Sequence, residues 1–143
     1  MVKRFAPLIS RTGPAMSDSV VATIQARTGR PDDAYSTWRK SWQEFTGPFL
    51  LFGEKRAGGR TYFTTGAAGS LQAVVFGFLG FRIDARPAPG AVWSKKLHGG
   101  RWLSVKPRLP KAWRSVTFRN FSVFGKKYTL TATHTYARVI QGD

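Results

Sequence analysis

The chain has 143 residues, a length that permits one domain, or one small domain and part of another. Its 42% hydrophobic and 14% aromatic content can bury a core, which excludes a disordered tail, and the lack of cysteine excludes disulfides and thiolate metal sites. Twenty-three Lys and Arg against seven Asp and Glu give a net charge of +16, which indicates either a solvated basic surface or an anionic partner.

The start of the chain carries no pattern typical of secretion. It lacks the charged, apolar and small-residue regions of a signal peptide, and the longest mainly apolar stretch, residues 71–81, is too short to span a bilayer. Lys3, Arg4 and Arg11 precede the first acid, Asp18, as in a solvated basic segment or the trace of a mitochondrial presequence. The compartment therefore stays open between cytoplasm and mitochondrion, and no membrane span is predicted.

The first predicted helix is short and ends at a glycine. Ser17 is placed to cap a helix that runs to about Thr28, just before Gly29. Its buried side is expected to carry three aliphatic residues, Val20, Val21 and Ile24.

Pro31 opens the second predicted helix, with Asp32 and Asp33 in the first turn, where the helix dipole favours negative charge. Aromatic residues then recur at spacings of three and four, namely Tyr35, Trp38, Trp42 and Phe45. Such a stripe is typical of a helix face that packs into a core.

A third helix is predicted over residues 66–79, capped by Thr64 or Thr65. It is apolar nearly all round, so we expect it to be buried in a larger body. Its three glycines, Gly66, Gly69 and Gly77, lower helix stability. Glycine is expected at such positions if another backbone or a ligand must come close to the helix.

The pattern after residue 81 indicates strands, following a segment, 87–100, that is rich in Pro and Gly. Strands are predicted over residues 102–106, 115–124 and 128–140. In the second, the alternation breaks at Arg119 and Asn120, which predicts a β-bulge. A hairpin turn is predicted at residues 124–127.

In the last predicted strand one face is expected to carry Tyr128, Leu130, Ala132, His134 and Tyr136, with threonines on the other. His134 is therefore expected to be packed, and His98, between lysines and glycines, to be exposed. Two histidines so placed predict no metal site. The fold class is α+β: helices first, then a small antiparallel β-sheet or sandwich module.

Two stretches carry a resemblance to a known family. One combines Gly13-Pro14-Ala15-Met16, Gly47-Pro48-Phe49 and Glu54 with YFTTGAAGSLQAVVFGFLGFRI, residues 62–83; the other is Leu109-Pro110-Lys111-Ala112-Trp113. Over residues 12–130 the chain resembles the C-terminal third of glycoside hydrolase family 65, especially its hydrolase branch, which cleaves trehalose, kojibiose and glucosyl-galactose. Ala68 departs from the usual Gly-Gly pair of the first motif.

The resemblance implies an (α/α)6 barrel followed by a C-terminal β domain. Residues 12–84 would then be the last helices of such a barrel, which they cannot close alone, and residues 85–143 the β domain. The chain would be inactive alone, because the family's catalytic acid lies earlier in the barrel, and it would not be a stable monomer. Its partner would be a complementary barrel segment or another chain of an assembly.

The resemblance also implies a role for Glu54. Inverting hydrolysis uses two carboxyl groups, and the glutamate that follows the Pro-Phe element, here Glu54, is similar to the general base that activates water. Thr64, Thr65 and Gly66 would bind substrate at a helix start. No histidine lies between Pro48 and Gly80, which disfavours the phosphorolytic branch. The implied substrate is a neutral α-glucoside, and no cofactor is implied.

A different class of function remains open: a non-catalytic basic remnant in a large assembly such as a mitochondrial ribosome, with RNA as its partner. Residues 87–143 carry eleven bases and one acid, a net charge of +10. Trp93, Trp102 and Trp113 are interleaved with bases, a pattern that fits phosphate contacts and base stacking. The bases concerned are Lys95, Lys96, Arg101, Lys106, Arg108, Lys111 and Arg114.

Overall fold

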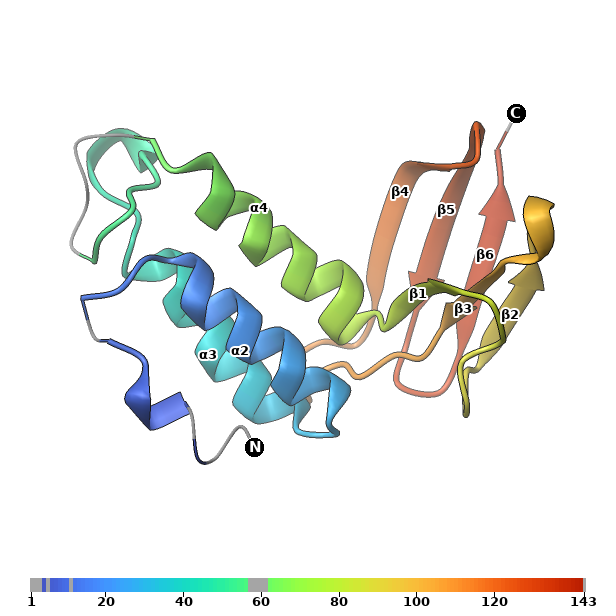
Figure 1. Cartoon of the computed structure of the whole chain (residues 1–143), viewed down its shortest axis with the longest axis horizontal. Helices are drawn as coiled ribbons and strands as arrows, with labels where there is room; N and C mark the ends of the chain where they lie inside the picture. Colours follow the sequence, from blue (N-terminus) through green and yellow to red (C-terminus); the bar gives the residue numbers. More distant parts are fainter. Residues whose placement is uncertain (1–3, 5, 11, 57–61, 143) are drawn as a thin grey trace.

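The computed structural model describes residues 4, 6–10, 12–56 and 62–142 and confirms the α+β class (Figure 1). Within these residues, the helices are α2 (Met16–Arg27), α3 (Pro31–Gln43) and α4 (Thr64–Gln72), which continues as the π-helical segment η3 (Ala73–Phe78). Short 3-10 turns are η1 (Ala6–Leu8), η2 (Pro48–Leu50) and η4 (His98–Gly100). Lys3 and Arg11 lie outside the described residues.

Local signals at the end of α2 and the start of α3 are confirmed. Gly29 has a φ of 82° and donates its N–H to the carbonyl of Ala26, while Arg30 donates to Gln25, the bonding pattern of a glycine-terminated helix. Pro31 is the first residue of α3, with Asp32 and Asp33 in its first turn. Proline fits there because the first helical N–H has no partner within the helix.

The predicted N-caps are wrong. Helix α2 begins one residue before Ser17, and Ala15, in the N-cap position, already has helical backbone angles. Helix α4 begins at Thr64 with Phe63 in the N-cap position, and neither cap residue makes a side-chain cap hydrogen bond. The reason is tertiary: the N–H groups of Ala15 and Phe63 donate to the carbonyls of Glu54 and Phe52, so the loop over 52–54 sets both helix starts.

The predicted buried face of α2 is also wrong. Its buried residues are Ser19, Ala22, Gln25 and Ala26. Of the three predicted residues, Val20 and Ile24 are exposed and Val21 is half-buried. The cause is close helix packing: a Cβ on Gly77 would lie 3.2 Å from the Cα of Thr23, and one on Gly69 would lie 3.4 Å from the Cβ of Ser19. Helices this close accept only small side chains between them, so the glycines serve backbone approach.

In the part of the chain that the structure describes, other residues cover one side of α4 and η3 and leave the other side open. Phe78 and Leu79 are fully buried, but Leu71 is 69% and Phe76 is 41% exposed. The exposed residues lie on the concave side of the molecule, between α4 and the sheets (Figure 1).

The strands form two antiparallel sheets, each of three strands in the described residues. One has the order β1-β3-β2, with β1 (Phe81–Asp84), β2 (Trp93–Lys96) and β3 (Trp102–Val105). The other has the order β4-β5-β6, with β4 (Val116–Val123), β5 (Lys126–Ala132) and β6 (Ala137–Gln141). Residues of both sheets share one buried cluster that includes Phe81, Leu103, Val105, Phe121, Tyr128 and Leu130.

Predictions for the strands are partly confirmed. The register shifts between Phe118 and Phe121, where Asn120 has a φ of 55°, so the bulge is real. The hairpin turn is also real, with left-handed angles at Phe124 and Gly125. Strands β1 and β2 were not predicted, because both are short and begin beside Gly- and Pro-rich segments.

The predicted strand over 128–140 is wrong, because the chain turns back at residues 133–136. The Thr133 hydroxyl accepts the N–H groups of Thr135 and Tyr136 at 3.4 and 3.1 Å, and these bonds close the turn. His134 and Tyr136 are therefore exposed rather than packed on the inner face. Tyr128, Leu130 and Ala132 do face the core as predicted.

Candidate functional site

Glu54 lies in a loop that is tied to the starts of two helices. Its backbone carbonyl accepts the N–H of Ala15 at 3.3 Å, at the start of α2. Gly53 pairs with Tyr62 in an antiparallel bridge, and the Phe63 N–H donates to the Phe52 carbonyl at 2.7 Å, at the start of α4. The loop is thus fixed at one end of the helices, while the Glu54 side chain is exposed.

The loop rests on a small apolar cluster of Ala15, Phe45 and Phe52. Gly66 belongs to the packing of this cluster: a Cβ there would lie 2.7 Å from the Phe63 ring and 2.8 Å from the Phe52 ring. Thr64 and Thr65, by contrast, are exposed at the first turn of α4. The structure therefore brings Glu54 and the predicted substrate-binding residues to the same end of the helices.

Arg56 binds two acids that the sequence analysis treated only as helix residues. Its guanidinium lies 2.7 Å from Asp18 of α2 and also pairs with Glu44 at the end of α3. The same guanidinium covers the Phe45 ring at 4.9 Å. The partners are 38 and 12 residues away along the chain, so spacing carried no signal of the pairing.

Arg56 keeps its positive charge in this position. Burial of the guanidinium acts to lower its pKa, but the hydrogen bond and charge of Asp18, followed by Glu44, outweigh burial and raise the pKa of Arg56 above its usual value. Arg56 therefore remains cationic and holds the Glu54 loop against α2 and α3.

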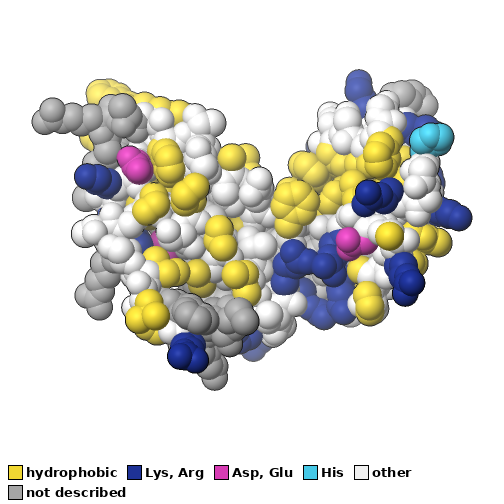
Figure 2. Space-filling model, in the orientation of Figure 1, with side chains coloured by type: hydrophobic (Ala, Val, Ile, Leu, Met, Phe, Trp, Pro, Cys, Tyr) yellow, Lys and Arg dark blue, Asp and Glu magenta, His cyan; other side chains and the backbone are white. Residues whose placement is uncertain are grey.

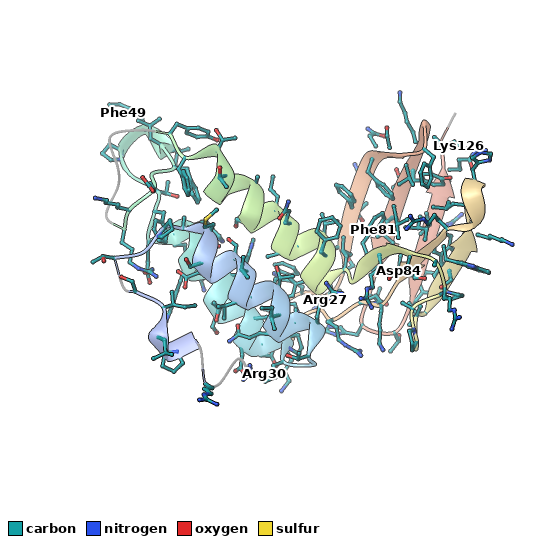
Figure 3. The ribbon with its side chains drawn as sticks, viewed as in Figure 1. Arg27, Arg30, Phe49, Phe81, Asp84 and Lys126 are labelled. Atoms are coloured by element: carbon teal, nitrogen blue, oxygen red, sulfur yellow. The ribbon has the colours of Figure 1, made fainter. Side chains whose placement is uncertain are left out.

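A strained turn precedes the loop at the same end of the helices. Phe49 and Leu50 have left-handed backbone angles, with φ of 57° and 59°, and are 95% and 85% exposed. Figure 3 shows Phe49 at the extreme end of the helical part, away from the sheets. A positive φ is unfavourable for such bulky residues, and strain of this kind concentrates at functional sites.

The seven bases of the RNA-binding alternative do not form one cluster. Lys106 and Arg108 line a pocket next to the helices, and Lys95 and Lys96 line another at the far end of the sheets. The remaining three, Arg101, Lys111 and Arg114, are exposed.

The tryptophans interleaved with these bases are half-buried, and two of them pack into cores. Trp93 packs against the cluster between the two sheets. Trp113 contacts the aromatic rings of Tyr35, Trp38 and Phe78. The contacts that the structure shows for Trp93 and Trp113 are therefore with other residues of the protein.

Neither a metal site nor a membrane helix is found in the described part of the chain. Groups of three or more His, Cys, Asp or Glu that could hold a metal ion do not occur among residues 4, 6–10, 12–56 and 62–142. Over the same residues, the helices are too short or too polar to cross a membrane. His98 is exposed, as predicted.

Comparison with known proteins points to one family. Residues 98–143 match the model for the glycosyl hydrolase family 65 C-terminal domain. A kojibiose hydrolase of Flavobacterium johnsoniae is 33% identical over 119 residues, which cover 82% of this chain and 16% of that protein. A protein-glucosylgalactosylhydroxylysine glucosidase of Dictyostelium discoideum is 28% identical over 122 residues, 85% of this chain and 15% of that protein.

A protein of the same name from Gallus gallus is 36% identical over 80 residues, 55% of this chain and 11% of that protein. The chain thus spans only a small part of the length of these relatives. The family model matches the end of the chain, after Glu54 and the motif over residues 62–83, whereas the similarity to the kojibiose hydrolase extends over 82% of the chain. The chain belongs to glycoside hydrolase family 65, of which it carries the C-terminal part.

Proposed function

We propose that the chain contributes to an inverting α-glucoside hydrolase and that Glu54 is the general base. The observation that carries the proposal is the position of Glu54, whose backbone is bonded to the start of α2 while its side chain is exposed. The two other acids nearby, Asp18 and Glu44, are paired with Arg56. Glu54 is therefore the carboxylate best placed to act on a bound water.

In this reaction Glu54 takes a proton from water as the water oxygen attacks the anomeric carbon. A second carboxyl group protonates the leaving glycosidic oxygen, about 6.5–9.5 Å from the first, so that the water fits between them. We propose that this acid comes from the part of the enzyme for which this chain has no counterpart. Thr64 and Thr65, exposed at the start of α4, would bind substrate hydroxyls.

We further propose that α2, α3 and α4 are the last helices of an (α/α)6 barrel, within residues 12–84, and that residues 85–143 form the β domain. Support comes from the apolar residues exposed on α2, α4 and η3, which further helices would cover; they are Val20, Ile24, Leu71 and Phe76. Strand β1 ends the first part and already pairs with β3 of the second, so the two parts are joined by a sheet. The partner is the complementary barrel segment.

The test is a chimera in which this chain replaces the matching segment of the Flavobacterium johnsoniae kojibiose hydrolase. Hydrolysis of kojibiose is measured, and NMR identifies the anomer released first. Glu54→Gln should lower kcat by about 10²–10⁴-fold, because water loses its base while the side-chain shape is kept.

Asp33→Asn is the control, since it also changes a carboxylate to an amide but lies in the first turn of α3, at the opposite end of that helix from Glu44, and it should leave kcat within about threefold. Turnover that survives Glu54→Gln would remove Glu54 from the mechanism. A folded but inactive chimera would contradict the hydrolase proposal as a whole.

A further inference from the structure

A basic pocket lies where the helices meet the first sheet. It has a volume of about 260 Å³ and is lined by Arg27, Gly77, Gly80, Arg82, Pro89, Lys106 and Arg108. None of these described lining residues is acidic. Figure 2 shows Lys and Arg side chains gathered at the junction between the helical part and the sheets.

The pocket's floor and one wall are fixed by backbone contacts. Gly80 has a φ of 59°, and a Cβ there would lie 2.0 Å from the Lys106 carbonyl oxygen, so the two backbones touch. The Lys106 N–H donates to the Gly80 carbonyl at 3.2 Å, and the Arg108 N–H donates to the Phe78 carbonyl at 2.6 Å. These bonds place Lys106 and Arg108 beside the end of η3.

The Lys106 side chain is also held in position. Its Nζ donates to the Pro89 carbonyl at 2.6 Å, which leaves two of its three ammonium hydrogens for another acceptor. Arg27 closes the pocket from the last turn of α2, next to the sheets (Figure 3). The four cations thus come from α2, β1 and the segment that follows β3.

Four like charges around one pocket repel each other unless an anion lies between them. Asp84 lies 3.5 Å from Arg82, but both side chains are largely exposed, so this ion pair is weak. Among the described residues, Arg27, Lys106 and Arg108 have no acidic side chain within 4 Å. The pocket therefore has an excess of positive charge and a floor of glycine backbone.

We propose that this pocket binds a phosphate group, either as free phosphate or as a phosphate ester. Guanidinium groups form paired hydrogen bonds with tetrahedral oxoanions, and lysine adds a point charge. A compact pocket with convergent cations fits a single small anion better than a nucleic-acid backbone, which needs an extended track of charges.

The site is separate from the proposed hydrolytic one and does not rest on it. Arg27 is at the C-terminal end of α2, and Glu54 is bonded to the N-terminal end. A 12-residue helix separates them by about 18 Å. A neutral glucoside carries no charge that these four cations would recognise. The ligand of this pocket is therefore an anion that differs from the proposed substrate.

The test is calorimetric titration of the full chain with inorganic phosphate at constant ionic strength. We expect saturable one-to-one binding that weakens by about tenfold or more in Arg27→Gln/Arg108→Gln, because two charged hydrogen-bonding groups are lost. Glucose should not bind in this pocket. Titration with glycerol phosphate distinguishes the sources: tighter binding than inorganic phosphate assigns the site to an ester, and weaker binding assigns it to the free ion.

The matched control is Lys96→Gln/Lys126→Gln, which removes the same charge from the pocket at the far end of the sheets. It should change phosphate affinity by less than about twofold, because the site is local. If the Arg27/Arg108 variant does not fold, Arg82→Gln, an exposed side chain, is compared with Lys96→Gln in the same way. No saturable binding, or equal weakening in the two sets of variants, would overturn the proposal. Tight binding of an RNA oligonucleotide that the two sets of variants weaken equally would also overturn the proposal. It would show that the positive charge binds polyanions over the whole surface and not at this pocket.

Discussion

The indole ring of Trp113 meets that of Trp38 edge-on, with ring centroids 5.3 Å apart and an angle of 86° between the planes. Trp113 precedes β4, whereas Trp38 lies in the middle of α3. The adjoining Lys111 N–H donates to the Asp32 carboxylate at 2.8 Å, at the start of α3. The segment between the sheets is therefore packed onto the helices, and the helical and β parts share a core.

Trp113→Ala should destabilise the chain by about 3 kcal/mol, because it removes a half-buried ring that contacts Tyr35, Trp38 and Phe78. Trp113→Phe keeps a ring and should recover about half of the loss. Urea unfolding followed by circular dichroism gives both values. A change below about 0.5 kcal/mol for the alanine variant would show that the two parts do not depend on this contact.

Gly80→Ala should cost more than about 3 kcal/mol, since the added Cβ would meet the Lys106 carbonyl at 2.0 Å in addition to the strain of a positive φ. Gly99 is the matched control: its φ is 70°, but nothing lies within 4 Å of its Cβ position among the described residues. Gly99→Ala should cost about 1 kcal/mol, the backbone term alone. Equal losses of unfolding free energy for the two variants would contradict the close approach at Gly80.

Asp18→Asn should weaken the fold more than Glu44→Gln, although both acids pair with Arg56. The Asp18 side chain is 13% exposed and that of Glu44 is 43% exposed, so solvent screens the second pair more. We expect losses of about 1–3 kcal/mol and less than about 1 kcal/mol, respectively, in chemical unfolding at neutral pH. The reverse order would contradict the pairing geometry.

The pH dependence of this ion pair follows from the raised pKa of Arg56. A basic group whose pKa is higher in the folded state stabilises fully below its unfolded pKa, and the stabilisation is lost only as the pH rises through the folded pKa. For an arginine this loss lies at strongly alkaline pH. The difference between the wild type and Arg56→Met should therefore stay constant between pH 7 and 9, as measured by unfolding at each pH.

The chain by itself should bind the dye ANS or self-associate. An apolar groove of about 480 Å³ lies between α4 and the sheets, lined by Leu71, Phe76, Phe81, Phe118 and Phe121 among others, and is visible as a hydrophobic hollow in Figure 2. Leu71→Gln should lower ANS fluorescence and sedimenting mass, because Leu71 is 69% exposed in the groove. Leu8→Gln, a similarly exposed leucine outside it, should change neither; an ANS-silent monomer would show that the groove needs no cover.

Features that depend on neighbouring residues in the chain could be predicted from the sequence alone. The start of α3 follows from Pro31, because its fixed φ suits the first helical position and its missing N–H costs nothing there. The end of α2 at Gly29 and the hairpin turn at Gly125 follow from the left-handed angles that glycine accepts. The bulge in β4 was visible as a break in the alternation of buried residues, and the motif over residues 62–83 identified the family.

The candidate site was predictable only in part. Glu54 was found through the resemblance of its motif, but the hydrogen bond that ties its loop to Ala15 joins residues 39 positions apart and has no local signal. The pairing of Arg56 with both Asp18 and Glu44 was not predicted, because these residues are also far apart along the chain.

Only the tertiary structure decided which faces are buried and which residues meet. Helix α2 turns small residues rather than Val20 and Ile24 inward, because Gly77 brings another backbone to within a few ångströms of it. The cations of the phosphate pocket are assembled from segments as distant as Arg27 and Arg108. Local sequence sets the backbone angles through sterics and hydrogen bonds that span a few residues, whereas burial and charge convergence depend on contacts between distant segments, which form only when the chain packs.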